Sequence, residues 1–456
     1  MNDAYDVLVI GAATAGSYFG KLMAEQGMKV LIVDRLSSET LGRRLDIFHL
    51  DKEVLPVFGV PEPRPGDDDY VTEFQSGLTL SPESNYPKTT EYPFIVSHMP
   101  LYIKRLNRWA ESFGAEISCD TEFADFVYDG NGKIAGALLQ KNGKPHTVAA
   151  KLVVDASGIA SAARSRLKDG YGVENFQVAD HEKFYVVLRY VKLKHPERDR
   201  VTRPCGWPAY KAWIAPQHDP DGAIIGIGQS HSFAHAEQAF QEFISRVRLP
   251  DYDVLYKEQG TTPFRRPPYS FVADGFLVIG DSACMTKSFS GEGVTSAWTL
   301  CKIAAETIAP IIKSGAPATR RAMWRVNTEY MRGQGAKLAH IMGWIGGAVN
   351  CTLSEQEFMF KHDIVFSDKA LTDTNRHFEA KMTVSEMLGW AFKMLGGVCS
   401  GQFRFSTVLS MLRSVFRAGN IKRHYQRYPG NEEAFDAWRQ KADLLWSRVD
   451  GVLRED

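Results

Sequence analysis

An aspartate at the end of an apolar run is the first residue that points to chemistry. Residues 276–298 read "FLVIGDSACMTKSFSGEGVTSAW", so Asp281 follows a strand-like segment and a polar loop leads to Gly291 and Gly293. A carboxylate at the tip of a buried strand is costly unless a nearby group uses it. The Gly-x-Gly that follows is typical of a helix start that approaches a ligand closely. The stretch therefore predicts a ligand site.

A second glycine-rich turn lies near the N-terminus. Residues 5–35 read "YDVLVIGAATAGSYFGKLMAEQGMKVLIVDR", which is typical of a strand, a turn, a helix and a second strand ending at Asp34. The turn follows G-x-G-x-x-G with Gly11 and Gly16 in place and Ala13 in the middle; alanine there would cost about 1 kcal/mol if the backbone needed a positive φ. Asp34 is placed to bind ribose hydroxyls. An ordinary strand–helix turn leaves Asp34 unexplained, so the pattern predicts a dinucleotide site.

The two turns fit one extended cofactor. If the dinucleotide is FAD, it extends from the turn at Gly11 toward a second junction at Asp281, which would accept a hydrogen bond from a ribityl hydroxyl. The helix that begins near Gly293 would direct its amides and its positive dipole end at the pyrimidine edge of the flavin. The alternative is a surface loop capped by glycine.

Three motifs together resemble a known family. The segments "GAATAGS" at 11–17, "VVDASGIASAAR" at 153–164 and "VIGDSACMTKSFSGEGV" at 278–294 are similar to the FAD fingerprints of the geranylgeranyl reductase family, within the p-hydroxybenzoate hydroxylase-like flavoproteins. The resemblance covers about residues 1 to 320 and is more specific for the cofactor than for the reaction. It implies FAD contacts from Gly11, Ala13, Ala15, Gly16, Asp34, Arg35, Arg44, Asp155, Gly158, Asp281, Gly291, Gly293 and Val294.

The chain departs from the family pattern at three places. Ser157 precedes Gly158 where hydroxylases of this fold usually have Asp-Gly, which weakens the hydroxylase interpretation and leaves the electron donor open. "LGRRLDIFHLD" replaces the cysteine-glycine segment of many reductases, and Arg43 or Arg44 could pair with a diphosphate there or form a solvated basic turn. "YKAWIAP" keeps only Trp213 and Pro216 of the motif Tyr-x-Trp-x-Phe-Pro, so a changed substrate wall is expected.

Residues for the chemical step are harder to select. Cys284 follows Asp281 closely, and Trp213 lies in the altered wall motif, so these two are the catalytic candidates; a buried structural thiol is the simpler explanation for Cys284. Further candidates stand in the same loop or in the expected roof of the flavin. They are His49, His98, Tyr210, Lys287 and Ser290. Isolated histidines are more often hydrogen-bonded structural residues.

Composition excludes several classes of protein. Lys+Arg and Asp+Glu both total 54, so no net charge attracts the chain to nucleic acid or an anionic membrane. The 6 cysteines are scattered without Cys-x-x-Cys pairs, which suits a reducing cytosol and predicts neither a metal site nor a disulfide framework. We expect a cytoplasmic protein without a signal peptide, with membrane association left open because the C-terminal part is rich in Met, Phe and Trp.

The order of the motifs predicts the organisation. We expect an α/β fold with a discontinuous, Rossmann-like FAD-binding domain from residues 1–170 and 265–320, because these segments must converge on one FAD. β-rich segments predict an antiparallel substrate domain over 171–264. Three-to-four spacing of apolar residues predicts a helical region over 321–456.

The resemblance implies an FAD-dependent oxidoreductase. The leading hypothesis is a reductase that saturates carbon–carbon double bonds of an isoprenoid or other apolar small molecule by hydride transfer from flavin N5. An FAD monooxygenase or halogenase-like enzyme acting on an aromatic or apolar compound is the alternative. A flavin-bound electron relay is the third reading. The external reductant, NADPH or a ferredoxin-type donor protein, stays open.

Overall fold

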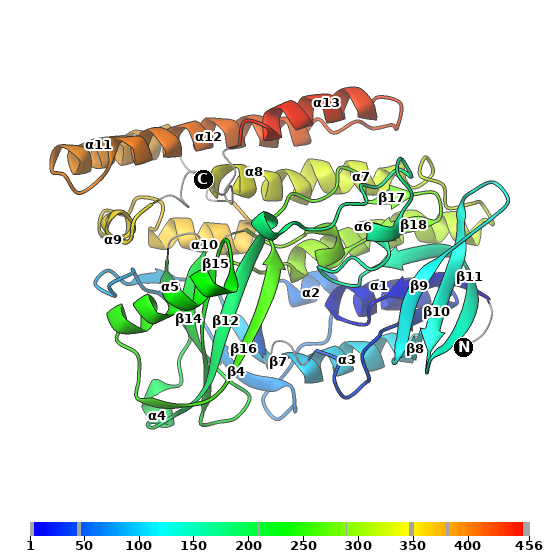
Figure 1. Ribbon diagram of the computed structural model, residues 1–456, viewed down its shortest axis with the longest axis horizontal. Coiled ribbons are helices and arrows are strands. Elements are labelled where there is room, and N and C mark those ends of the chain that lie inside the picture. Colours follow the sequence, from blue (N-terminus) through cyan, green and yellow to red (C-terminus); the bar gives the residue numbers. More distant parts are fainter. Residues whose placement is uncertain are drawn as a thin grey trace.

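Two sheets lie side by side beneath a layer of long helices (Figure 1). The computed structural model describes residues 4–42, 47–207, 210–288, 290–345, 351–379 and 383–449 of the chain. The sheet that contains the N-terminal strand lies at one end, and helices from the last part of the chain run along the top. The expected class, α/β with an antiparallel sheet and a helical C-terminal region, is confirmed.

The main sheet is built around a central N-terminal strand. Its order is β17 (Val272–Ala273), β18 (Phe276–Val278), β11 (Lys144–Asp155), β1 (Ala4–Ile10), β2 (Val30–Val33), β8 (Glu116–Ser118), with β10 (Ile134–Lys141) and β9 (Thr121–Tyr128) continuing from β11. β18, β11, β1, β2 and β8 run parallel. Their residues form nearly continuous apolar runs because such strands are covered on both faces.

The register aligns the ends of the three strands that precede the glycine-rich motifs. Ile10 of β1 pairs with Asp155 of β11, and Asp155 pairs with Val278 of β18. The carboxyl ends of parallel strands meet at one edge, where α/β proteins bind ligands. Segments that are far apart in sequence therefore enter their loops side by side.

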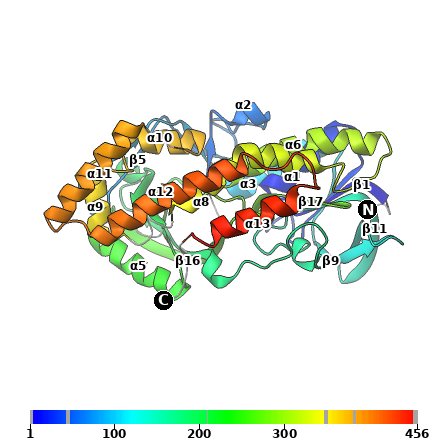
Figure 2. The same ribbon diagram turned by 90° about the horizontal axis from the view of Figure 1, so that it is seen from above.

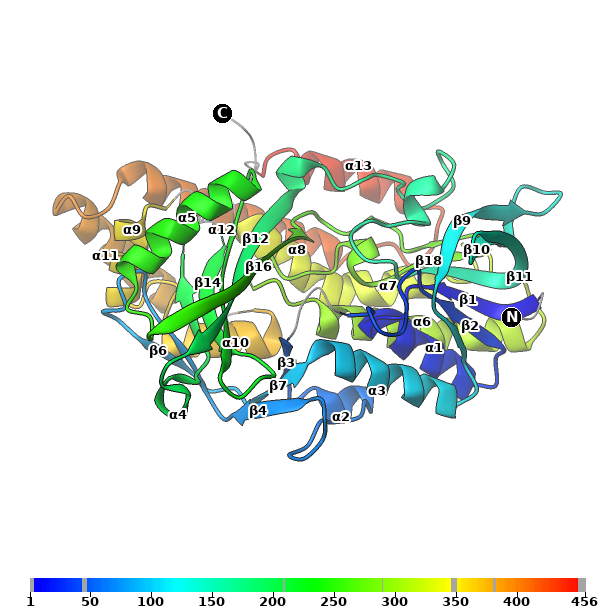
Figure 3. The same cartoon turned by 60° about the horizontal axis from the view of Figure 1, so that its bottom comes forward.

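Three helices pack together beside this sheet. α1 (Thr14–Glu25) packs against α3 (Met99–Ser112) and α6 (Val294–Lys313), as Figure 3 shows. Trp298 of α6 donates its indole N–H to the carbonyl oxygen of Thr14 at 3.1 Å, and its ring lies 5.5 Å from that of Tyr18. The contact joins the starts of the two helices that follow the first and third motifs.

The second sheet is antiparallel, and its two faces have different neighbours. Its order is β13 (Arg203–Gly206), β14 (Lys211–Pro216), β15 (Gly222–Gln229), β12 (Lys183–Leu193), β16 (Tyr252–Pro263). Val187 packs toward Phe240 and Phe243 of α5 (Phe233–Arg246), whereas the neighbouring Val186 and Leu188 line a cavity on the other face. Because successive side chains of a strand point to opposite faces, one face of the sheet packs against α5 and the other lines the cavity.

Several short elements complete the fold. They are β3 (Ile47–Asp51), α2 (Leu55–Phe58), β4 (Tyr70–Phe74), β5 (Gly77–Thr79), β6 (Lys88–Thr90), β7 (Phe94–His98) and α4 (Pro196–Asp199). β3, β7 and β4 form a three-stranded sheet, and β5 pairs with β6. The polar, turn-rich stretch 80–93 contains the short strand β6.

The C-terminal helices form the upper layer. They are α7 (Trp324–Tyr330), α8 (Ala336–Ile345), α9 (Leu353–Lys361), α10 (Asp368–His377), α11 (Val384–Cys399), α12 (Phe405–Tyr425) and α13 (Phe435–Trp446). Gly343 of α8 lies against Ala418 of α12, where an added Cβ would stand 3.2 Å from the Ala418 Cα. Among the described residues, no helix has the length and apolar character that crossing a bilayer requires.

A fully buried arginine joins the second and third motifs. The guanidinium of Arg164 donates to the carbonyl oxygens of Ser282, Glu174 and Phe176 at 2.8, 3.1 and 2.6 Å. It also donates to the Ser161 hydroxyl at 2.7 Å. Arg164 thus ties its own segment to the two segments that provide these carbonyl groups. Loss of its guanidinium would leave the buried carbonyl groups without donors, which is costly.

Replacement of Arg164 by Met is expected to destabilise the protein by about 2–4 kcal/mol, because it leaves several buried acceptors without donors. The midpoint of urea denaturation measures the effect. Arg166→Met is the matched control, since Arg166 is exposed, and it should shift the midpoint little. Equal midpoints for the two variants would contradict the assigned role of Arg164.

Candidate functional site

One cavity of about 780 Å³ lies where the main sheet, the second sheet and the C-terminal helices meet. Its polar end contains residues from all three glycine-rich motifs. They are Ala13, Thr14, Ala15, Ala156, Gly158, Gly280, Asp281, Gly291, Glu292, Gly293 and Val294. Residues far apart in the chain are therefore brought to one wall, as the sequence motifs require.

The first motif forms a tight strand-to-helix turn. Gly11 has φ +111°, and an added Cβ would stand 2.2 Å from the carbonyl oxygen of Ala156. Gly16 lets α1 pack on the turn, since a Cβ there would stand 1.9 Å from the carbonyl oxygen of Gly11. Ala13 has φ −89° at the N-cap of α1. Its backbone is ordinary, so the methyl group at the middle position of the motif causes no strain.

Asp34 closes the first βαβ unit. Its carboxylate accepts hydrogen bonds from the backbone N–H of Ala12 at 3.0 Å and of Leu36 at 2.9 Å. A second cavity of about 950 Å³ lies nearby. It is lined by Ser38, which follows Asp34 in the chain, and by Cys119, which follows the neighbouring strand β8. Arg35 is exposed, whereas Arg44, another expected contact, lies outside the described residues.

Asp155 supports the site from beneath and does not line the cavity. Its buried carboxylate accepts hydrogen bonds from the Ser157 hydroxyl at 2.6 Å and from the Ser282 hydroxyl at 2.9 Å. The backbone N–H groups of Ser157, Ala163 and Arg164 also donate to it. Ser157, where hydroxylases of this fold usually have aspartate, thus makes a structural hydrogen bond, and Ala156 and Gly158 form the wall in this region.

The third motif directs a carboxylate and a helix start into the cavity. Asp281 lines the wall, and its Oδ1 accepts a hydrogen bond from the Thr286 hydroxyl at 2.9 Å. Burial raises the pKa of Asp281, opposed by the Thr286 hydrogen bond. Gly293 is the N-cap of α6, a helix of 20 residues, without a side-chain cap. Its first amides are thus available for an electron-rich group.

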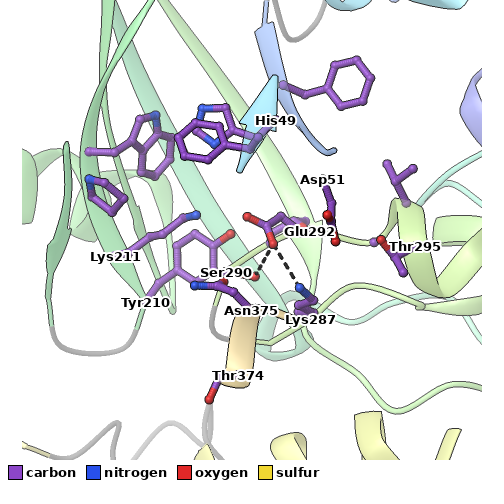
Figure 4. A pocket seen from close by; sticks show the side chains of 18 of the residues that line it. His49, Asp51, Tyr210, Lys211, Lys287, Ser290, Glu292, Thr295, Thr374 and Asn375 are labelled. Carbon is purple, nitrogen blue, oxygen red and sulfur yellow. Dashed lines mark hydrogen bonds and ion pairs between the residues drawn. The ribbon is translucent and has the colours of Figure 1, made fainter. Parts of the chain in front are cut away.

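A cluster of charged side chains surrounds Glu292 (Figure 4). Lys287 lies 3.1 Å from its Oε2, and the Ser290 hydroxyl donates to the same oxygen at 3.3 Å. Burial alone would raise the pKa of Glu292, but Lys287, Lys211 and His49 outweigh it and lower the pKa to about 2. Glu292 is therefore an anion that balances nearby cations.

Two basic groups in the roof have lowered pKa values. Burial lowers the pKa of Lys211, partly opposed by Glu292. Burial also lowers the pKa of His49 to about 4, so its imidazole is neutral near pH 7. Tyr210 stacks on Phe184 at 4.7 Å, and its hydroxyl would stand 1.7 Å from a Cβ added at Gly291. The tyrosine therefore lies directly against the third motif.

The other end of the cavity is apolar. The second sheet contributes Trp213, and four helices of the upper layer add bulky side chains. These are Trp344 of α8, Phe360 of α9, Leu371 of α10 and Trp390 of α11, with Phe366 and Phe378 next to α10. Lys287 lies 3.9 Å above the Phe378 ring, which joins the two ends. The site can thus hold a polar group at one end and a hydrocarbon at the other.

The structure separates the candidate residues. Trp213, His49, Tyr210, Lys287 and Ser290 line the cavity. Cys284 and His98 do not line it. Cys284 is buried behind the motif with φ +53°, and burial raises its pKa to about 12, so the thiol is neutral. His98 stacks on His218 at 4.4 Å.

Sequence reasoning missed two residues of the charged cluster. Glu292 stands between the glycines of the third motif, so a carboxylate inside a Gly-x-Gly was a visible signal. Lys211 lies in the altered wall segment "YKAWIAP" and was not among the candidates. Its place opposite Glu292 depends on contact between β14 and a loop distant in sequence, which spacing does not reveal.

His49 predicts a pH dependence of stability. The folded pKa is about 4 and the ordinary value is 6.5, so between these values the unfolded chain binds more protons. The free energy of unfolding is therefore expected to fall as the pH is lowered through this window, with a slope that corresponds to at most about one proton. His49→Gln should reduce that slope. Thermal unfolding of both proteins across the window measures it. The control is His146→Gln, at an exposed histidine; equal slopes for wild type and His49→Gln would contradict the prediction.

Sequence comparisons agree with this geometry. Residues 4–202 match the family described as FAD binding domain. The chain is 24% identical to a digeranylgeranylglycerophospholipid reductase of Sulfolobus acidocaldarius, with 98% of this chain and 99% of the relative covered. A protein of the same name from Methanocaldococcus jannaschii is 26% identical, with 69% and 79% covered.

Solved structures share the fold. A geranylgeranyl bacteriochlorophyll reductase-like protein of Thermoplasma acidophilum superposes with a TM-score of 0.67 at 18% identity, covering 87% of this chain and 98% of that one. A flavin-dependent brominase gives a TM-score of 0.62 at 18% identity, covering 93% and 100%. A p-nitrophenol 4-monooxygenase of Pseudomonas putida also gives 0.62, at 15% identity, covering 84% and 100%.

The likeness spans reductases, a halogenase and a monooxygenase, so the shared fold defines the cofactor more closely than the reaction. The two sequence relatives described above, in contrast, carry the name of one kind of reductase, in one case over 98% of this chain. The chain is therefore an FAD-dependent oxidoreductase of the p-hydroxybenzoate hydroxylase-like fold, and its resemblance to the geranylgeranyl reductase family is confirmed.

Proposed function

We propose that this chain uses FAD to reduce carbon–carbon double bonds of an isoprenoid or another apolar substrate. The observation that carries the proposal is the continuity of one cavity, which begins at the glycine-rich motifs and continues between apolar side chains of the second sheet and the C-terminal helices. A compact aromatic substrate would not need an apolar lining that extends to four helices. The name of the Sulfolobus acidocaldarius relative supports the same substrate class.

The residues at the polar end fit the adenosine diphosphate part of FAD. The turn from Gly11 to Gly16 presents the start of α1, with Ala13 and Ala15 on the cavity wall, where backbone amides bind phosphate oxygens. Asp34 lies at the end of β2, a position suited to ribose hydroxyls, while its bond to Ala12 fixes the turn. Gly158 borders the groove from the neighbouring strand.

The third motif fits the ribityl and flavin parts. Asp281 faces the cavity as an acceptor for a ribityl hydroxyl, with Thr286 orienting its carboxylate. Gly291 and Gly293 allow close approach of the backbone, and the start of α6 at Val294 presents N–H groups and a positive dipole end to the pyrimidine edge. The Trp298 contact with Thr14 fixes the spacing between the two halves of this cradle.

Bound flavin would supply a hydride from N5. The protein must then hold the alkene beside the ring, exclude water and deliver a proton to the other carbon. Trp213 and Phe366 line the apolar part of the cavity and would orient a hydrocarbon there. Glu292 and Lys287 pair with each other, so the pair adds no net charge to the cavity.

Lys211 is the proton donor that the geometry favours. It lies in the roof beside Tyr210 and Trp213, with its ammonium 5.9 and 5.7 Å from the two ring centres. Burial lowers its pKa, which makes the ammonium a stronger acid than an exposed lysine. His49 is neutral and Glu292 is ionised near pH 7, so neither is a comparable acid.

Anaerobic turnover tests the proposed function. Purified protein loaded with FAD and reduced chemically is incubated with a polyprenyl lipid, which bypasses the choice between NADPH and a ferredoxin-type donor. The expected product gains two hydrogens for each double bond, as measured by mass spectrometry. Failure of this reaction, together with oxygen-dependent hydroxylation or halogenation of a test substrate, would overturn the proposal.

A monooxygenase or halogenase-like reaction is the second candidate. The observation in its favour is the TM-score of 0.62 with the flavin-dependent brominase over nearly all of this chain. It predicts consumption of oxygen in the presence of substrate, whereas the reductase turns over without oxygen. The same assay run with and without oxygen separates the two.

Gly11→Ala is expected to abolish FAD retention. The new Cβ would stand 2.2 Å from the Ala156 carbonyl oxygen, and the backbone has φ +111°, so the turn must move. The ratio of flavin to protein absorbance measures retention. The control is Gly27→Ala, whose φ of +81° is also unfavourable but where a Cβ meets open space; this variant should lose about 1 kcal/mol of stability and keep FAD. Retention of FAD by Gly11→Ala would contradict the assigned turn.

Lys211→Met is expected to lower the turnover rate by about 10²-fold without changing FAD retention, because general acid catalysis contributes about that much. The wild-type rate should fall as the pH rises through the lowered pKa of Lys211, and this limb should be absent in the variant. Rate measurements across the pH range check both effects. Lys257→Met, at an exposed lysine, is the control; an unchanged rate in Lys211→Met would remove Lys211 from the mechanism.

A further inference from the structure

The outermost helices of the upper layer expose large apolar side chains. α11 exposes Met387, Leu388, Phe392 and Leu395, and α12 exposes Phe405, Leu409, Leu412 and Phe416. Phe392 and Phe416 are 75% and 73% exposed. Figure 2 shows both helices in front when the molecule is viewed from above. We call these eight residues the α11–α12 face.

The spacing along α12 makes the exposed residues a continuous stripe. Phe405, Leu409, Leu412 and Phe416 are separated by four, three and four positions, which places them on one side of a helix. Met411 and Ala418 are buried on the opposite side. An amphipathic helix normally turns its apolar side to the core. α12 has a second apolar side that faces outward.

The surroundings of the α11–α12 face are basic. Residues 383–425 include six Lys and Arg side chains and one carboxylate, Glu386, whereas the two charge types balance over the whole chain. Two of the six, Arg404 and Lys422, pair with Glu355 and Glu379 outside this range, which leaves a smaller basic excess. Lys393 and Arg413 are exposed. A bulky apolar stripe flanked by basic side chains suits an anionic phospholipid surface, because the apolar groups enter the acyl boundary while the cations meet the head groups.

The same helices reach the cavity from their inner side. Trp390 of α11 and Val415 of α12 line its apolar end, together with Leu371 of α10. Trp390 is two residues from Leu388 and from Phe392, and Val415 adjoins Phe416. One layer of helix therefore separates the outward apolar face from the inner apolar lining.

We propose that the α11–α12 face docks on the surface of an anionic phospholipid bilayer. Docking would place the apolar end of the cavity next to the membrane, so that a lipid substrate reaches the flavin without crossing water. The delivery step rests on the proposed function, whereas the docking itself does not depend on turnover. A second copy of this chain seated on the same face is the competing occupant.

Vesicle sedimentation tests the proposal with full-length protein loaded with FAD. We expect binding to vesicles that contain phosphatidylglycerol, weaker binding to pure phosphatidylcholine, and loss of the difference at high salt. Phe392→Ser with Phe416→Ser should lower the partition coefficient at least about tenfold. Lys393→Gln with Arg413→Gln should lower it by about fivefold for each charge on anionic vesicles only.

The matched control uses equally exposed apolar residues elsewhere. Leu255 of β16 is 56% exposed, as is Leu388 of α11, so Leu255→Ser with Val254→Ser should leave the partition coefficient unchanged. Light scattering gives the oligomeric state of every variant. A wild type that does not bind vesicles, equal losses in the control, or a dimer that dissociates in Phe392→Ser/Phe416→Ser would each overturn the proposal.

Failure of docking and failure of the proposed function are distinguishable. Binding is measured without reductant or substrate turnover, and turnover is measured with detergent-dispersed lipid. If the reductase proposal is correct, Phe392→Ser/Phe416→Ser should retain activity on dispersed lipid and lose it on lipid in vesicles. Vesicle binding without any reduction would refute the reductase proposal and leave docking supported.

Discussion

The site depends on a carboxylate that lies beneath the cavity wall. Asp155 is paired in register between Ile10 and Val278, and it accepts hydrogen bonds from its own loop and from Ser282 of the third motif. Burying a polar group costs little when its hydrogen bonds to water are replaced by hydrogen bonds from the protein, as they are here. Arg164 adds donors to the same region. Together they fix the distance between the second and third motifs.

This constraint shapes the polar end of the cavity but not its apolar end. The polar end is formed by backbone, so glycines and helix starts dominate it, and its walls are set by the sheet edge. The apolar end is formed by side chains from the second sheet and from several C-terminal helices, which can vary without disturbing the cradle.

Local pattern predicted the three turns well because each strand, turn and helix start is continuous in sequence. The sequence could not show that Asp155 accepts a hydrogen bond from Ser282, which is 127 residues away. Nor could it show that the left-handed backbone at Cys284 buries the thiol away from the cavity. Glu292 was visible, but its partner Lys211 comes from another sheet. The apolar end escaped prediction because separate helices each contribute one or two side chains.

A crystal structure of the protein with FAD tests the central claim most directly. The account predicts an extended cofactor that lies across the carboxyl ends of β1, β11 and β18, with a ribityl hydroxyl within hydrogen-bond distance of Asp281 and the flavin ring against the start of α6. A cofactor bound elsewhere, or one whose ribityl chain is out of reach of Asp281, would contradict it.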